Sequence, residues 1–131
     1  SLSGNFVTAL KELLERFSPD IILIEPSGVG KLSDVVRACC APEILPLAAV
    51  KAKITVVDVQ RCALYLENFG EFFEDQIENA DTVVPSRAEA SPKKARATEK
   101  MVQELNHHAR ILSLPCPVNI PPAATAALAS C

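Results

Sequence analysis

The sequence predicts an α/β fold, with a mostly parallel sheet flanked by helices in three layers. Two observations support this prediction. The aliphatic run at residues 21–24 is too short for a lone helix and too apolar for a strand with one wet face, and the β-branched residues at 54–59 predict a second buried strand. Around them lie longer segments whose apolar residues recur every three to four positions, as on one helix face. Helices that alternate with strands are typical of parallel sheets with right-handed crossovers.

An amphipathic helix is predicted before the first strand, and Pro19 ends it. The strand at 21–24, expected at the centre of the sheet, follows. A short helix capped by Ser33 comes next, and then a long amphipathic segment over 62–79, which Gly70 is expected to break. The first helix has an apolar face that comprises Phe6, Val7, Leu10, Leu13, Leu14 and Phe17.

The last predicted helix begins at Ser91 and Pro92, a cap followed by proline at the first helical position. It ends at Asn106. A fourth short strand is predicted at 111–114, and the alanine-rich tail is expected to form a loop and a short helix.

Composition limits the classes of function. The chain has 131 residues, of which 49% are hydrophobic and 22% are charged, so we expect a single globular domain over 1–131. The formal net charge is −3 and no basic stripe is visible, which disfavours nucleic-acid binding. No apolar run reaches membrane-spanning length and no signal peptide is recognisable, so we expect no membrane partner and a cytoplasmic location.

The cysteines and histidines do not predict a metal site. There are five cysteines, with irregular spacing and no C-x-x-C pair, which argues against a disulfide framework. Cys39 and Cys40 are adjacent, as are His107 and His108, and neighbouring side chains diverge on a helix. We therefore expect no metal bound to this chain.

The loop after the first strand is not a Walker A phosphate-binding loop. Such a loop needs a glycine five residues before its Gly-Lys pair and Ser or Thr directly after the lysine. Glu25 and Leu32 hold those two places. Lys31 is therefore predicted to be a solvated loop lysine.

The candidate site consists of residues that follow the strands, because ligands of open α/β sheets bind beyond the carboxyl ends of strands. Glu25 and Gly28 follow the first strand, and Asp58 lies in the second. An acid in such a place also commonly caps the next helix, and this alternative stays open for Asp58. Ser86-Arg87-Ala88-Glu89 follows another short apolar run and is, by itself, typical of an ordinary loop.

In their order, these motifs resemble the CobW/HypB/UreG family of P-loop GTPases, from Phe6 to about Leu114. Glu25-Pro-Ser-Gly28 is similar to the Glu-x-x-Gly at the end of the family's Walker B strand. The resemblance implies that Glu25 lies near the nucleotide magnesium and Gly28 near the terminal phosphate. It also implies that Asp58, in a strand similar to the family's Val-Val-Asp strand, helps to shape the floor of the site.

Ser86, Arg87 and Glu89 stand where the family has Asn-Lys-x-Asp or a looser Ser/Thr-Lys/Arg-x-Asp. The resemblance implies that the carboxylate accepts two hydrogen bonds from guanine and that the basic side chain lies over the purine. Glu89 is one methylene longer than the family's aspartate, so the choice between GTP and ATP stays open. Pro85 is a second departure, acceptable only where the strand needs no ladder donor.

The resemblance implies a GTP-binding and GTP-hydrolysing metallochaperone, for metal delivery or cobalamin biosynthesis. Its cofactors in the intact protein would be GTP and Mg²⁺, with a transition metal such as zinc or cobalt, and its partner a metal-receiving protein. A non-catalytic α/β interaction module and an ATP-preferring relative remain alternatives. The family's Walker A loop and Cys-x-Cys-Cys motif have no counterpart here. We therefore expect the chain alone neither to bind GTP tightly nor to hydrolyse it, and we expect an open sheet edge that allows homodimerisation.

Overall fold

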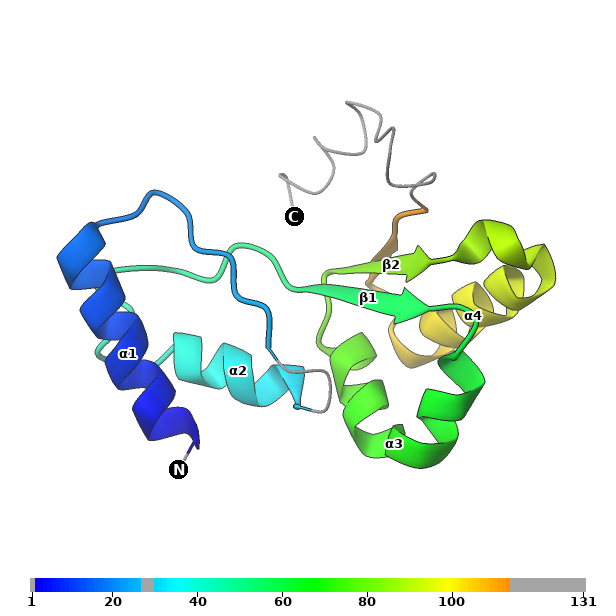
Figure 1. Ribbon diagram of the computed structural model, residues 1–131, viewed down its shortest axis with the longest axis horizontal. Coiled ribbons are helices and arrows are strands. Elements are labelled where there is room, and N and C mark those ends of the chain that lie inside the picture. Colours follow the sequence, from blue (N-terminus) through cyan, green and yellow to red (C-terminus); the bar gives the residue numbers. More distant parts are fainter. Residues whose placement is uncertain (1, 27–29, 114–131) are drawn as a thin grey trace. The chain divides into compact units, whose positions relative to one another are not determined.

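The computed structural model describes the backbone of residues 2–26 and 30–113, and the side chains of these ranges from residue 4 onward. The chain divides into two compact units, Ser1–Lys51 and Ala52–Cys131 (Figure 1). The single domain predicted over 1–131 stays a prediction.

In the first unit, helices α1 (Leu2–Phe17) and α2 (Leu32–Cys39) pack against each other. The predicted N-terminal helix is therefore confirmed. It ends at Phe17, and the next residue, Ser18, has a left-handed backbone with φ 43° and donates its N–H to the carbonyl of Leu14 at 3.1 Å. The buried core of this unit consists of Leu10, Leu14, Cys39 and Ile44.

Helix α2 begins without the cap that the sequence predicts. Its N-cap is Lys31, which makes no side-chain capping bond, and Ser33 lies inside the first turn. The first turn of α2 instead contains Asp34, whose negative charge interacts favourably with the positive end of the helix dipole. Its carboxylate also pairs with the Arg37 guanidinium at 3.1 Å. The prediction that Ser33 caps this helix was wrong.

Residues 21–24 form no strand. The segment 21–26 has no regular structure, and Ile21 and Leu23 are 88% and 92% exposed, whereas Ile22 packs against the core of the first unit. The described part of this unit contains no strand at all, and a strand forms only where another one satisfies its backbone hydrogen bonds. The buried central strand predicted from this aliphatic run was therefore wrong.

We expect Leu23→Lys to change the free energy of unfolding by less than about 0.5 kcal/mol, because this side chain has almost no buried contacts to lose. Ile44→Lys is the matched control in the same unit. It buries a charge at a position that is 1% exposed, and should cost more than about 3 kcal/mol. Urea unfolding followed by circular dichroism measures both. Equal losses would place residues 21–24 in the core after all.

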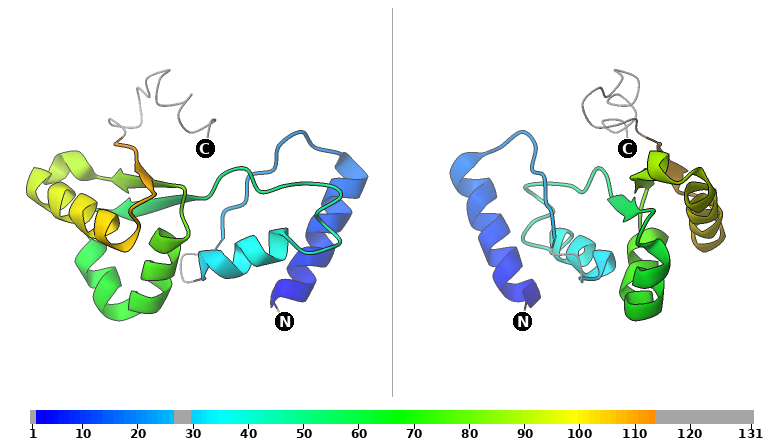
Figure 2. Two further views of the ribbon diagram at one scale, coloured as in Figure 1. Left: turned by 180° about the vertical axis from the view of Figure 1, so that it is seen from behind. Right: turned by 45° about the vertical axis from the view of Figure 1, so that its right-hand side comes forward.

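The second unit is a parallel sheet with two covering helices. Strands β1 (Ile54–Asp58), β2 (Thr82–Ser86) and β3 (Arg110–Ile111) pair in that order. Helix α3 (Cys62–Glu78) connects β1 to β2 and packs on β1. The short 3₁₀-helix η1 (Ala88–Ala90) and α4 (Pro92–Leu105) connect β2 to β3, and α4 packs on β2 and on α3 (Figure 1; Figure 2). The predicted α/β class with a parallel sheet is confirmed.

Strand β1 has one buried face and one exposed face. Thr55 and Val57 are buried, and Thr55 Oγ1 donates to the carbonyl of Gln76 in α3 at 2.5 Å. Ile54 and Val56 point the other way and are exposed. The buried strand predicted at 54–59 is therefore present, but only one of its faces is buried. β1 is also an edge strand of the described sheet, and homodimerisation through a sheet edge stays a prediction.

Helix α3 bends at Phe69, where φ is −132° and ψ is 32°. The bend lies next to Gly70, where the sequence predicts a break. Tyr65 lies close to the rings of Phe69 and Phe73, with centroid distances of 6.2 and 6.4 Å. Phe73 and Ile77, in the second half of the helix, are buried, so this half supplies most of its core contacts.

Pro85 occupies a place in β2 that needs no ladder donor. The N–H of Thr82 donates to the carbonyl of Lys53, whereas the carbonyl of Val83 accepts from the N–H of Leu112. The backbone groups of successive residues in β2 therefore point alternately toward β1 and toward β3. Pro85 lies two residues after Val83, so its backbone nitrogen and carbonyl point toward β3. The ladder between β2 and β3 covers only two residue pairs and ends before Pro85.

The last strand is shorter than predicted and begins one residue earlier, at Arg110 rather than at residue 111. Residue 114 and the predicted helix of the tail lie outside the described residues. None of the helices in the described ranges has the length and apolarity needed to span a membrane.

Candidate functional site

Three of the predicted site residues meet where β1 and β2 end. Asp58, the last residue of β1, is in register with Ser86, the last residue of β2. The N–H of Val59 donates to the carbonyl of Ser86 at 3.1 Å, and Ser86 Oγ donates to the carbonyl of Val57 at 3.4 Å. Because the strands are parallel, these bonds bring Arg87, the next residue, alongside Asp58.

Arg87 forms a two-point ion pair with Asp58. Its Nε donates to Oδ1 at 3.0 Å and its Nη2 donates to Oδ2. The side chain of Arg87 is 52% exposed and that of Asp58 is 24% exposed. Asp58 Oδ1 also accepts the N–H of Gln60 at 3.0 Å, which orders the turn before α3. Asp58 is not the cap of that helix, since the N-cap is Arg61.

The backbone of Arg87 is left-handed, with φ 56° and ψ 28°, a conformation uncommon for residues other than glycine. It lies between the end of β2 and the turn of η1. Ser91 then caps α4, because its Oγ accepts the N–H of Lys94 at 3.4 Å, as the sequence predicts. The loop that carries Arg87 is therefore anchored at both ends.

The ion pair lowers the pKa of the Asp58 carboxyl. The hydrogen bond from the Arg87 side chain is the largest cause; partial burial acts in the opposite direction, and the N–H of Gln60 lowers the pKa further. In the unfolded chain this pKa is about 3.9. The pair therefore contributes its full stability above that pH, and the contribution is lost as the pH falls through the lower folded-state pKa.

We expect carbon-13 NMR to show the Asp58 carboxyl titrating below about pH 3.9, and Arg87→Ala to raise its pKa toward that ordinary value. Arg96→Ala removes an exposed arginine from α4 and serves as the control, with no expected effect. An Asp58 pKa that is the same with and without the Arg87 side chain would contradict the ion pair.

The other predicted site residues are Glu89, Glu25 and Gly28, and they take no part in the ion pair. Glu89 is exposed in η1, two residues after Arg87, where a ligand can reach its carboxylate. Glu25 belongs to the first unit and is exposed in the irregular segment 21–26. Gly28 lies outside the described residues. The roles of Glu25 and Gly28 at magnesium and phosphate stay predictions.

Gln60 is a polar residue at this edge that the sequence analysis missed. Its Nε2 is buried and has no hydrogen-bond partner among the described residues. A buried donor left without a partner costs about 1–3 kcal/mol, so the position favours an added oxygen from water or a ligand. The sequence carries no signal for this, because only the tertiary contacts bury the amide.

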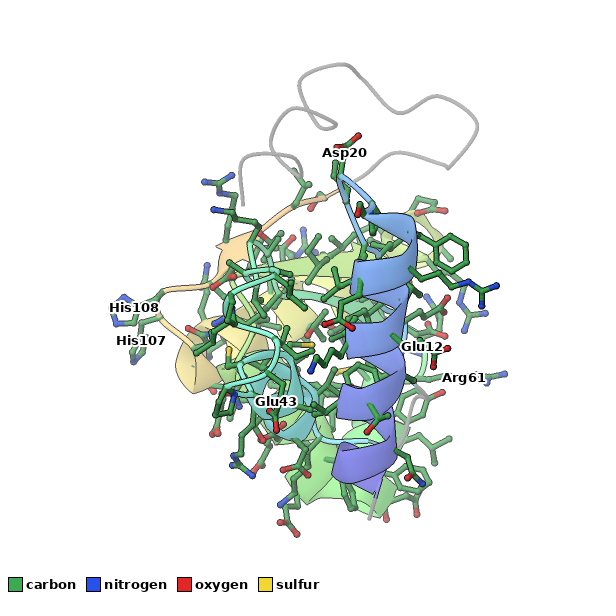
Figure 3. The ribbon with its side chains drawn as sticks, turned by 90° about the vertical axis from the view of Figure 1, so that its left-hand side faces the viewer. Glu12, Asp20, Glu43, Arg61, His107 and His108 are labelled. Atoms are coloured by element: carbon green, nitrogen blue, oxygen red, sulfur yellow. The ribbon has the colours of Figure 1, made fainter. Side chains whose placement is uncertain are left out.

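The described residues do not fit a resident transition metal. In those ranges, no three side chains of His, Cys, Asp or Glu gather into a group that could hold a metal ion. His107 and His108 extend into solvent from the turn after α4 (Figure 3). Burial raises the pKa of the Cys39 and Cys62 thiols, which disfavours the thiolates that bind metals.

The loop after β2 presents a planar cation, Arg87, and a carboxylate, Glu89. Asp58 pairs with Arg87 and so offsets its charge. The planar guanidinium can still stack on a ring, and the Glu89 carboxylate can accept hydrogen bonds from ring N–H groups.

Comparison with known proteins places this site inside a matched region. A family model described as "CobW/HypB/UreG, nucleotide-binding domain" matches residues 1–113. The chain is also similar to the zinc chaperone YeiR of Escherichia coli (strain K12), with 27% identity over 96 residues. That alignment covers 72% of this chain but only 29% of the relative, so the chain spans less than a third of the relative's length. No solved structure shows significant similarity.

Proposed function

Because the chain belongs to the CobW/HypB/UreG family of nucleotide-binding domains, we propose that it is part of a GTP-binding, GTP-hydrolysing protein that delivers a metal ion. The observation that carries the proposal is the edge where β1 and β2 end, since Asp58, Ser86 and Arg87 meet there inside the matched region. Similarity to a zinc chaperone supports delivery of a metal and favours zinc over cobalt as the cargo. A role in cobalamin biosynthesis stays a prediction.

In this proposal the loop after β2 binds the guanine base. The Glu89 carboxylate accepts hydrogen bonds from the base, and the Arg87 side chain lies against its ring. Ser86 holds the loop to β1 through its Oγ. Glu25 and Gly28 act at the phosphate end, where Mg²⁺ neutralises charge during phosphoryl transfer.

The metal ion is the cargo in this proposal and not a resident group of the described residues. Hydrolysis of GTP drives a conformational change that loads or releases the ion, because loops that contact a terminal phosphate rearrange when it leaves. The proposed partner is a protein that receives the metal.

Calorimetric titration of GTP and of ATP, each with Mg²⁺, into the full-length gene product tests the proposal. We expect GTP to bind more tightly than ATP. Glu89→Ala should weaken GTP binding by about 10- to 100-fold and leave ATP binding unchanged, because hydrogen bonds to a charged group contribute about 1.5–3 kcal/mol. Glu104→Ala, at an exposed glutamate of α4, is the matched control and should change neither affinity.

Two other results would favour the alternatives. Tighter binding of ATP would make the protein an ATP-preferring relative. Binding of neither nucleotide would make it a non-catalytic interaction module. Ile21 and Leu23 support the second alternative, because large aliphatic side chains that are almost fully exposed often mark a contact surface.

A further inference from the structure

Arg87 is held both at its backbone and at the end of its side chain. Its backbone follows Ser86, whose carbonyl and Oγ both bond to the chain around Asp58. Its guanidinium meets the Asp58 carboxylate at two points, and the N–H of Gln60 holds that carboxylate in turn. A long and flexible side chain is thereby restricted to one orientation.

The ion pair restricts Arg87 without covering it. Both hydrogen bonds to Asp58 use Nε and Nη2, which lie along one edge of the planar group. In-plane bonds of this kind leave the faces of the guanidinium available for stacking on a ring. About half of the side chain is exposed, so a ligand can reach it.

We propose that Asp58 is a positioning residue that holds the guanidinium plane of Arg87 as a preformed stacking surface for a purine ring. This inference rests on the proposed nucleotide binding and adds the residue that orients the loop. A side chain ordered in advance loses less conformational entropy when the ligand binds, so its orientation contributes to affinity.

Few other charged or titratable groups act on this pair. Arg61 is the other cation near Asp58, but its side chain is exposed and extends away from the second unit (Figure 3). Cys62 interacts with Asp58, and Tyr65 interacts with Arg87. Removal of Asp58 therefore leaves Arg87 without another carboxylate among these neighbours.

The opposite end of the same two strands offers a matched control. Asp81 directly precedes β2, accepts the N–H of Lys53 at 3.0 Å and lies 3.6 Å from its Nζ. Asp81→Asn removes the same charge from the same strand pair without touching Arg87. A general loss of stability would affect both variants, whereas positioning of Arg87 depends only on Asp58.

A first experiment needs no nucleotide. Nitrogen-15 relaxation should show Arg87 Nε to be ordered in the wild type, and Asp58→Asn should make it as mobile as the exposed Arg61 Nε. Asp81→Asn should leave it ordered. The inference is overturned if Arg87 Nε is already as mobile as Arg61 Nε in the wild type, or if Asp58→Asn leaves it unchanged.

A second experiment measures ligand binding to the full-length gene product by calorimetry, with Mg²⁺-GTP and, as a probe without a base, Mg²⁺-tripolyphosphate. Asp58→Asn should weaken GTP binding about 10-fold and leave tripolyphosphate binding unchanged. Arg87→Lys should cause a similar loss, because lysine keeps the charge but has no planar group. Asp81→Asn should leave both affinities unchanged.

The outcomes separate this inference from the proposed function. If the wild type binds GTP and Asp58→Asn binds it equally well, or loses affinity for both probes equally, the positioning role is wrong and nucleotide binding stands. If the wild type does not bind GTP, the proposed function fails and this inference fails with it.

Discussion

Asn106→Ala is expected to lower the free energy of unfolding of the second unit by about 3 kcal/mol. Asn106 follows α4, and its side chain bonds to the backbone at the C-terminal end of α3 and to the turn directly after α4. Removal of the side chain takes a hydrogen bond from each of five backbone groups, and each lost bond costs free energy, although the Ile77 carbonyl and the Ala109 N–H keep a backbone partner. The Nδ2 donates to the carbonyls of Ile77, Glu78 and Ala80 at 2.9, 3.1 and 3.0 Å, and Oδ1 accepts from the N–H groups of His108 and Ala109 at 3.0 and 3.1 Å.

Urea unfolding followed by Tyr65 fluorescence measures this loss, because the chain has one tyrosine and no tryptophan and Tyr65 lies in α3 of the second unit. Asn79→Ala is the control. Asn79 also ends a helix, but its Nδ2 bonds only to Asp75, one turn earlier, so the expected loss is about 1 kcal/mol or less. If both variants lose the same stability, Asn106 does not join the segments as described.

Asn106→Asp distinguishes the contribution of the Nδ2 bonds to three carbonyls from that of the Oδ1 bonds to two N–H groups. The new carboxylate still accepts from the two N–H groups that follow α4, but it sets an oxygen against three carbonyl oxygens. We therefore expect it to cost at least as much as Asn106→Ala at neutral pH. A variant as stable as the wild type would mean that the three carbonyl contacts contribute nothing.

Ile77→Ala is expected to cost about 3–4 kcal/mol, because Ile77 is fully buried and its loss leaves a cavity under the sheet. The same tyrosine signal reports it. Leu64→Ala, on the same helix but at a position that is 56% exposed, is the control and should cost less than about 1 kcal/mol. Similar losses for the two variants would show that the buried face of α3 is assigned incorrectly.

The sequence was most informative where local pattern and local packing agree. In the second unit, apolar periodicity identified both helices, Ser91 identified the start of α4, and Gly70 marked the bend in α3 to within one residue. Alternation of strands and helices predicted a parallel sheet, and the carboxyl ends of parallel strands share one edge. For that reason Asp58, Ser86 and Arg87 could be predicted as neighbours.

Local pattern failed for residues 21–24 because a strand depends on a partner and not on hydrophobicity alone. Four consecutive aliphatic residues show that a segment can be buried in a sheet, but they do not show which strand it would pair with. In the first unit, the described residues provide no such partner, and Ile21 and Leu23 stay exposed.

By itself, then, the sequence determined the α/β class, most helices and the edge of the sheet where Asp58, Ser86 and Arg87 meet, because periodicity and strand order are properties of the chain. Only the tertiary structure decided how those residues are used. The bonds between Asp58 and Arg87 join residues 29 positions apart, and the three carbonyl contacts of Asn106 span 26 to 29 positions. Such bonds depend on which side-chain and backbone groups the fold brings together, and this is not encoded in any local pattern.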